Sequence, residues 1–222
     1  MIDQVQYSVV IPTYNSSGFL DKTVSEIESA LSQLGQSFEI IIVDDFSTDN
    51  TWNRIKELKQ TNSRIKGIRL SKNFGQHKAT ICGFSAASGQ FVITMDDDLE
   101  SDPKQISALV EKQKETNADL VYAHYTNLKR GFLRTIMYGV FKLSAKIVEG
   151  KNRVNGSSFR LVKGTLAKKI IQNANSFTFM DELFLWNTEK VEFANVTHQQ
   201  GLRGRSNYSI RGLVNTSTEL ML

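Results

Sequence analysis

The strongest constraint in this sequence is a regular alternation of short apolar runs with amphipathic segments over its first 123 residues. The runs are rich in β-branched residues, which is typical of strands buried on both faces of a parallel sheet. We predict strands at residues 7–11, 38–43, 65–70, 91–95 and 120–123, with helices at 19–34, 51–59, 78–87 and 103–116. Pro12 is expected to stop the first strand. This alternation predicts a doubly wound α/β fold, with a mostly parallel central sheet flanked by helices.

Polar clusters directly follow three of the predicted strands. They are residues 13–15, the pair Asp44-Asp45 and the acidic run from Asp96 to Glu100. In open α/β sheets, ligands bind beyond the carboxyl ends of the strands. We therefore expect the three clusters to line one crevice.

The acidic run Asp96-Asp97-Asp98-Leu99-Glu100 holds four acids in five residues. If the strand continued in extended form, the carboxylates of Asp96, Asp98 and Glu100 would face one way. Hard divalent cations relieve such repulsion through oxygen ligands, and Mg²⁺ fills its other positions with phosphate oxygens and water. The run therefore predicts a metal and diphosphate site. The alternative is a solvated acidic turn that caps the helix after Pro103.

The pair Asp44-Asp45 also follows an apolar strand. A carboxylate there can accept hydrogen bonds from a nucleobase N–H or a ribose hydroxyl. The alternative is a helix N-cap, a position that Asp favours. Together with the later acidic run, the pair indicates a ligand contact for one of the two aspartates.

The composition narrows the class of protein. The 222 residues are 40% hydrophobic and 23% charged, as in a soluble globular domain and unlike a disordered chain. A net charge of +4 does not by itself indicate a nucleic-acid-binding protein. The single cysteine, Cys82, excludes an intrachain disulfide and indicates a reducing compartment. No apolar run reaches the ~18 residues of a membrane span, so we expect a cytoplasmic protein.

The second half of the chain departs from the alternating pattern. Residues 131–149 show the pattern of a long amphipathic helix, and basic residues surround it from 129 to 153. Such a stretch is typical of a helix on an anionic membrane surface, or of a helix packed on the sheet with a solvated basic edge. We therefore expect one domain in two parts: residues 1–125, which carry the three polar clusters, and residues 126–222, an extension with peripheral membrane contact.

Four segments of this sequence resemble family 2 glycosyltransferases of GT-A fold, and in particular their polyprenyl-phosphate and dolichol-phosphate branch. They are Val9–Asn15, Val43–Asp49, Leu70–Gly75 and Met95–Pro103, with Phe46 standing where the family usually has Gly. The resemblance extends over essentially the whole chain, and it implies a half that binds the sugar donor at residues 1–125 and an acceptor-side half of the same domain at residues 126–222. It implies an enzyme that moves a sugar, with inversion, from a UDP, GDP or dTDP sugar to a lipid-linked or saccharide acceptor. Cell-envelope polysaccharide or glycolipid synthesis is the implied setting.

The resemblance also implies roles for individual residues on the donor side. Asp96 and Asp98 would hold Mg²⁺ or Mn²⁺ and the diphosphate, and Glu100 would make a further metal contact. The expected donor-binding residues, three of which would hold the nucleoside, are Pro12, Tyr14, Asp45, Lys72 and Asp97.

On the acceptor side the sequence departs from the branch. Ser158 stands where the branch carries an Asp proposed as a base, and a serine hydroxyl is too weak a base at neutral pH. Asp181 is therefore the predicted catalytic base. It should be essential for a hydroxyl acceptor, whereas a phosphate acceptor is already ionised and needs little or no base. The expected residues at the rim of the site are His198, Arg203, Ser206 and Tyr208.

Other classes of protein fit the sequence less well. A phosphatase of the haloacid dehalogenase class also places Asp-x-Asp after an apolar strand, but it needs a small residue where Glu100 stands. It also leaves Asp44-Asp45 unexplained. A dinucleotide-dependent oxidoreductase is disfavoured because no G-x-G-x-x-G follows the first strand. Ser158 keeps one alternative open, a non-catalytic nucleotide-binding protein of the same fold.

Overall fold

The computed structural model describes residues 5–126, 156–173, 180–199 and 201–202. Its sheet has the strand order β3-β2-β1-β4-β6-β5-β7. The strands are β1 (Tyr7–Thr13), β2 (Phe38–Asp44), β3 (Ile65–Arg69), β4 (Phe91–Thr94), β5 (Leu120–Tyr125), β6 (Arg160–Lys163) and β7 (Val191–Val196). The α-helices are α1 (Leu20–Gln33), α2 (Thr51–Thr61), α3 (Gln76–Ala86), α4 (Ile106–Thr116), α6 (Gly164–Asn173) and α7 (Met180–Asn187), and a 3₁₀ turn, η1, spans Pro103–Gln105.

The sheet is parallel from β3 through β2 and β1 to β4. Strand β6 runs antiparallel to both β4 and β5, and β7 pairs in parallel with β5. The predicted doubly wound, mostly parallel α/β fold is therefore confirmed, and β6 and β7 from the second half belong to the same sheet. Because β1 lies between β2 and β4, the strand order reverses beside it. Ligands bind at such a switch point in open α/β sheets.

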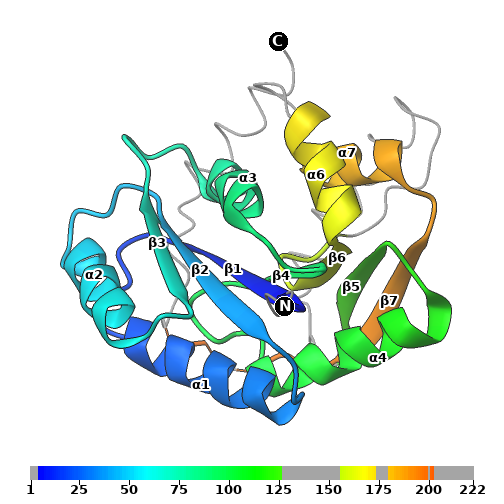
Figure 1. Ribbon diagram of the computed structural model, residues 1–222, viewed down its shortest axis with the longest axis horizontal. Helices are drawn as coiled ribbons and strands as arrows, with labels where there is room; N and C mark the ends of the chain where they lie inside the picture. Colours follow the sequence, from blue (N-terminus) through cyan, green and yellow to red (C-terminus); the bar gives the residue numbers. More distant parts are fainter. Residues whose placement is uncertain (1–4, 127–155, 174–179, 200, 203–222) are drawn as a thin grey trace, which may run out of the picture.

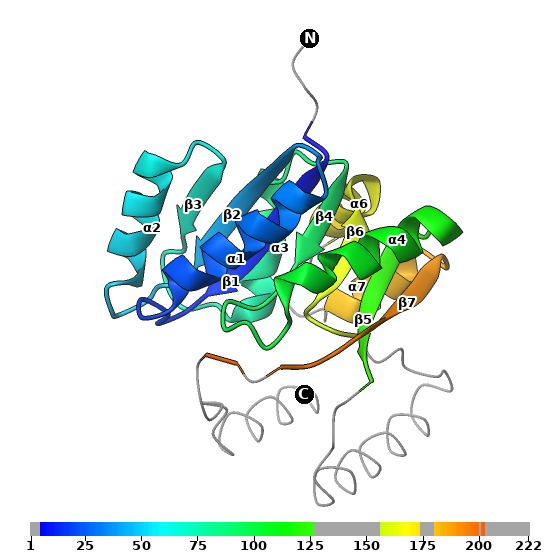
Figure 2. The same cartoon turned by 90° about the horizontal axis from the view of Figure 1, so that it is seen from below.

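Helices cover both faces of the sheet (Figure 1). Helices α1, α2 and α4 lie on one face, and Figure 2 shows α1 and α4 crossing in front of the strands. Helices α3, α6 and α7 lie on the other face. Alternate residues of one strand enter the two cores: Val9 and Ile11 pack with α1, and Val10 packs with α3. Burial on both faces explains why the strands read as continuous apolar runs.

The structure corrects the prediction that Pro12 stops the first strand, because β1 continues to Thr13. The carbonyl of Val10 accepts a hydrogen bond from Met95 N, and the ladder to β4 ends there at the Val10–Thr94 pair. Residues two apart in a strand face the same neighbour. Pro12 therefore faces the side where β4 has already ended, and its missing N–H leaves no ladder bond unmade.

The chain between β4 and β5 also differs in detail from the prediction. The helix expected over 103–116 is a 3₁₀ turn followed by α4. Asp102 caps this turn, since its side chain accepts a hydrogen bond from Lys104 N at 2.9 Å. The capping role considered for the acidic run therefore belongs to Asp102, outside the run.

No helix in the described part of the chain is long and apolar enough to cross a membrane. The basic helix expected at residues 131–149 lies outside the described residues. The expected rim residues Arg203, Ser206 and Tyr208 lie outside them as well.

Candidate active site

A pocket of about 190 Å³ lies at the carboxyl end of β1 and β4, where the strand order reverses. Three of the predicted site residues line it together: Pro12, Asp96 and Asp181. They come from β1, from the loop after β4 and from the first turn of α7. The pocket lining also includes Gln76, His77, Ser158 and Arg160. The donor-side and acceptor-side predictions thus meet in one cavity.

The acidic run does not continue β4 in extended form, so that prediction is wrong. Asp97 and Asp98 form a turn, and Leu99 has a left-handed backbone with φ of 59°. The buried Leu99 side chain enters the interior at this turn. Because the chain reverses here, the acidic side chains of the run point to different surroundings.

Asp96 lies at the pocket, and both of its carboxylate oxygens accept a hydrogen bond. Gln76 Nε2, from the start of α3, donates to Oδ1, and Ser158 Oγ donates to Oδ2 at 2.6 Å. Burial, together with the charges of Asp98 and Asp97, raises the pKa of Asp96 to about 6, although the Ser158 hydrogen bond and the charge of Arg160 lower it. Ionisation of Asp96 in the folded protein therefore costs free energy.

Asp97 points into the protein. Its Oδ2 accepts hydrogen bonds from Thr13 Oγ1 at 2.5 Å and from Ser16 Oγ, and its carbonyl accepts one from Thr23 Oγ1 at 2.6 Å. The carboxylate therefore holds the acidic run against the end of β1 and the start of α1. The donor contact expected for Asp97 stays a prediction.

The segment after β7 packs along the acidic run, and Figure 2 shows it crossing the end of the sheet. Gln199 N donates to the carbonyl of Glu100, and Leu202 N donates to that of Asp98. His198 Nε2 lies 3.3 Å from Glu100 Oε2. A Cβ at Gly201 would lie 2.5 Å from Glu100 Cγ, so only glycine lets the segment approach this closely.

Within the described residues, no group of three or more His, Cys, Asp or Glu side chains is arranged to hold a metal ion. Glu100 lies 3.3 Å from His198, and its side chain and that of Asp98 both lie within 4 Å of a Cβ placed at Gly201. Metal binding by Asp96, Asp98 and Glu100 stays a prediction. Asp96 and Asp98 remain close enough for the charge of one to raise the pKa of the other. Mg²⁺ typically takes one or two carboxylates and completes its coordination with phosphate oxygens and water, so this pair fits such an ion.

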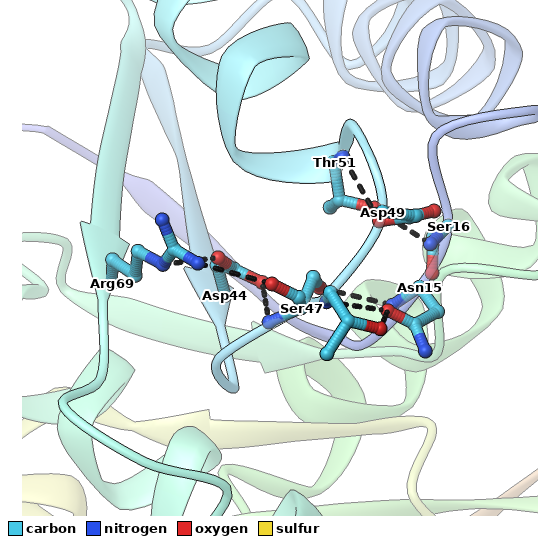
Figure 3. A network of polar contacts seen from close by, with 8 residues as sticks. Asn15, Ser16, Asp44, Ser47, Asp49, Thr51 and Arg69 are labelled. Carbon is cyan, nitrogen blue, oxygen red and sulfur yellow. Dashed lines mark hydrogen bonds and ion pairs between the residues drawn. The ribbon is translucent and has the colours of Figure 1, made fainter.

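Asp44 belongs to a polar network that joins the ends of β1 and β2 (Figure 3). It accepts a hydrogen bond from Ser47 N at 3.0 Å, and its Oδ2 lies 3.3 Å from Arg69 Nε. Ser47 Oγ in turn accepts a hydrogen bond from Asn15 N. The N-cap residue of α2 is Asn50, so neither Asp44 nor Asp45 is the helix N-cap considered from the sequence.

Asp45 sets the position of the loop before α3. Its two oxygens accept hydrogen bonds from Phe74 N at 2.7 Å and Gly75 N at 2.8 Å. Gly75 has φ of 86° and precedes the first residue of α3, Gln76, which reaches Asp96. Asp45 therefore connects the two aspartate motifs through the backbone of this loop.

The other expected donor-binding residues lie outside the pocket. Tyr14 is exposed at the end of β1, and the ammonium of Lys72 lies 5.0 Å from the ring centre of Phe74. The side chain of Phe46 is also exposed, and the guanidinium of Arg69 lies 5.3 Å from its ring centre. Contact of Tyr14, Asp45 and Lys72 with a donor stays a prediction.

Asp181 and Arg160 form an ion pair on the acceptor side of the pocket. Arg160 Nη1 lies 2.6 Å from Asp181 Oδ1, and the hydroxyl of Tyr122 donates to the same oxygen at 2.8 Å. Burial raises the pKa of Tyr122, so its hydroxyl stays protonated and able to donate. Burial, together with the charge of Arg160, lowers the pKa of His77, which keeps that imidazole neutral at pH 7. A base role for Asp181 stays a prediction.

Sequence reasoning missed several residues of this pocket. Gln76 and His77 directly follow the segment Leu70–Gly75, and Arg160 lies two residues after Ser158. Because these three residues adjoin segments that resemble the family, they could have been predicted as site residues. Tyr122 lies within an apolar strand, and nothing in the sequence distinguishes it from a core residue.

The model of one protein family, glycosyl transferase family 2, matches residues 8–165 of this chain. Two curated proteins, from Aeromonas hydrophila and Serratia proteamaculans, are each 31% identical to it over 96% of this chain. Both are undecaprenyl-phosphate 4-deoxy-4-formamido-L-arabinose transferases. The chain spans 66% of the length of each of these relatives.

Solved structures share the fold at lower identity. A glucosyl-3-phosphoglycerate synthase from Mycobacterium tuberculosis, with Mn²⁺, UDP-glucose and phosphoglyceric acid bound, matches with a TM-score of 0.67 and 17% identity. This match covers 98% of the present chain and 77% of that one. A mannosyltransferase from Pyrobaculum calidifontis, with GDP-mannose and Mn²⁺, has a TM-score of 0.61 at 13% identity, over 97% and 61% of the two chains.

Proposed function

Because the chain belongs to glycosyl transferase family 2, we propose that it transfers a sugar from a nucleoside diphosphate sugar to a polyprenyl phosphate in cell-envelope synthesis. The observation that carries the proposal is the pocket that joins Asp96, after β4, to Arg160 at the start of β6. The names of the two curated relatives, both transferases to undecaprenyl phosphate, support the acceptor class. Peripheral membrane contact follows from such an acceptor.

On the donor side, the diphosphate would lie beside Asp96 and Asp98. These carboxylates would hold Mg²⁺ or Mn²⁺, since the pair fits a hard cation that keeps phosphate oxygens among its ligands. When bound, the ion supplies positive charge that stabilises the departing nucleoside diphosphate. Gln76 and Ser158 hold the Asp96 carboxylate in place from two sides. Tyr14, at the end of β1, would contact the nucleoside.

On the acceptor side, the attacking group would enter the pocket next to Arg160. A phosphate oxygen attacks the anomeric carbon in line with the leaving group and has no proton to lose. Among the described residues that line the pocket, Arg160 is the only lysine or arginine. It is therefore the cationic side chain that would bind that phosphate. This chemistry is consistent with Ser158 in place of a carboxylate base.

A second candidate is transfer to a saccharide hydroxyl. It is favoured by the Asp181 carboxylate, which reaches the pocket and could accept the proton of such an acceptor. A third is a nucleotide-binding protein without transferase activity. The first two candidates differ in the acceptor of the sugar, and the third transfers no sugar at all.

The first test is calorimetric binding of UDP, GDP and dTDP, with and without Mg²⁺ or Mn²⁺, to the native chain and to Asp98→Asn. We expect one nucleotide to bind, and its affinity to fall at least about tenfold without metal or in Asp98→Asn. Asp102→Asn, which alters a nearby aspartate that caps η1, is the matched control and should bind like the native chain.

The matching nucleotide sugars are then offered with undecaprenyl phosphate in detergent and, separately, with free saccharides. Transfer to the lipid phosphate supports the proposal, and transfer only to a saccharide supports the second candidate. Nucleotide binding without any transfer supports the third. Absence of nucleotide binding, with or without metal, would remove the basis of all three.

A further inference from the structure

Arg160 is a buried cation at the pocket, and its surroundings fix its orientation. The residue is 5% exposed, and its side chain lies against the rings of Tyr122 and Phe184, at 5.6 and 5.2 Å from their centres. Its Nε donates to Thr94 Oγ1 at 3.2 Å, and its Nη1 donates to Asp181 Oδ1 at 2.6 Å. The guanidinium is thus held by two hydrogen bonds and lies against two aromatic side chains.

The Asp181 carboxylate is held in turn by residues from two strands. Arg160 and Tyr122 both donate to the same oxygen, Oδ1. Gly156 leaves the space that the carboxylate occupies, since a Cβ there would lie 2.1 Å from Asp181 Oδ2. Two hydrogen-bond donors therefore point at one carboxylate oxygen. This geometry lets Asp181 hold the side chains of Arg160 and Tyr122 in place.

The charges that line the pocket indicate what Arg160 and Asp181 can do there. Asp96 supplies negative charge on the donor side, and His77 is neutral at pH 7 because burial and Arg160 lower its pKa. A phosphate entering this space needs the Arg160 cation at a fixed place. It has no proton for Asp181 to take.

We propose that Asp181 is a positioning residue that holds Arg160 toward the phosphate of the acceptor, and that it does not act as the general base. The inference rests on the proposed transfer to a lipid phosphate. It predicts that the hydrogen-bond acceptor at Oδ1 is required, whereas the negative charge and the ability to take up a proton are dispensable.

Two substitutions at this position separate the roles. Asp181→Asn keeps a carbonyl oxygen that can accept from Arg160 and Tyr122, but it cannot act as a base. Asp181→Ala removes the acceptor altogether. With undecaprenyl phosphate as acceptor, we expect Asp181→Asn to keep kcat within about threefold of the native value and Asp181→Ala to raise the acceptor KM at least about tenfold.

The donor side provides an internal check. Nucleotide affinity, measured by calorimetry, should stay within about twofold in both variants, because Asp181 acts on the acceptor side. The matched control pair is Asp119→Asn and Asp119→Ala. Asp119 pairs with Lys163 at 3.3 Å, at the other end of β6, so both control variants should transfer sugar like the native chain.

The outcomes distinguish the inference from the function on which it rests. A loss of kcat of about 100-fold or more in Asp181→Asn, with nucleotide binding intact, would show that the charge or the proton uptake of Asp181 is required, and it would overturn the inference alone. If Asp181→Ala fails to fold, this result with Asp181→Asn still decides. A native chain that binds nucleotide but transfers nothing to undecaprenyl phosphate contradicts the proposed function, and the inference falls with it.

Discussion

At the scale of single residues, Asp96 lies at the pocket, and keeping its carboxylate ionised there costs folding free energy. Burial raises its pKa to about 6, above the 3.8 of an unperturbed Asp. Between these two values the folded protein binds more protons at Asp96 than the unfolded chain does. Stability contributed by this residue is therefore lost as pH rises through that window, and the cost is fully present above it. The difference corresponds to roughly 3 kcal/mol.

We predict that Asp96→Asn stabilises the metal-free protein at pH 7.5 and has little effect at pH 3, where Asp96 is largely protonated in both the folded and the unfolded chain. The free energy of unfolding, measured by urea denaturation in the presence of a chelator, should rise by up to roughly 3 kcal/mol at pH 7.5. Saturating Mg²⁺ should reduce this gain by stabilising the native carboxylates. An equal effect at both pH values would refute the assignment of the cost to the Asp96 charge.

At the scale of elements, the position of the pocket depends on how closely α3 packs on β1. Helix α3 carries Gln76 and His77 in its first turn, and Asp45 fixes the loop before it. The contact with the strand is made at Gly83, where a Cβ would lie 2.2 Å from Val10 Cγ1. A side chain at this position would push the helix away from the sheet, and the pocket residues would move with it.

Gly83→Ala should therefore destabilise the protein by about 1–3 kcal/mol, a typical cost of overpacking a core. Gly18→Ala is the control, because nothing lies within 4 Å of a Cβ at Gly18. In Gly83→Ala with Val10→Ala, the shortened side chain should relieve part of the clash, so the two effects should be less than additive. Fully additive losses in urea denaturation would show that Gly83 does not contact Val10 in solution.

At the scale of the whole molecule, the two halves of the chain meet at the pocket. Strands β4 and β6 pair antiparallel, and this pairing brings Ser158 and Arg160 beside Asp96. A ligand in the pocket contacts residues from β1, α3, β6 and α7. Because such a ligand binds only the folded chain, it stabilises both halves together.

We expect the nucleotide identified by calorimetry, with Mg²⁺, to raise the free energy of unfolding by about 2.7 kcal/mol at 100 times its Kd. Thermal unfolding should remain a single transition. In Asp98→Asn the same nucleotide concentration should give a much smaller shift. Two separate transitions in the native chain, only one of them shifted by nucleotide, would contradict a sheet that joins both halves.

The sequence alone determined the order of elements through β5, the doubly wound sheet and the family. These depend on local patterns, namely apolar runs long enough for buried strands, helical spacing between them and motifs that are contiguous in the chain. It also predicted roles for Asp96 and Asp181, which line one pocket in the structure, and those roles stay predictions. The end of β1 was misplaced since the effect of a proline depends on whether its side of the strand has a neighbour.

Only the tertiary structure decided which side chains face one another. The turn at Asp97-Asp98 is set by burial of Leu99 and by hydrogen bonds to Thr13 and Ser16, more than 80 residues away in the chain. It takes the run out of the extended form, and no spacing rule within the run predicts this. The contact of Arg160 with Tyr122 and Asp181 likewise joins β6, β5 and α7. Long-range packing fixes these contacts, so they are absent from any local pattern.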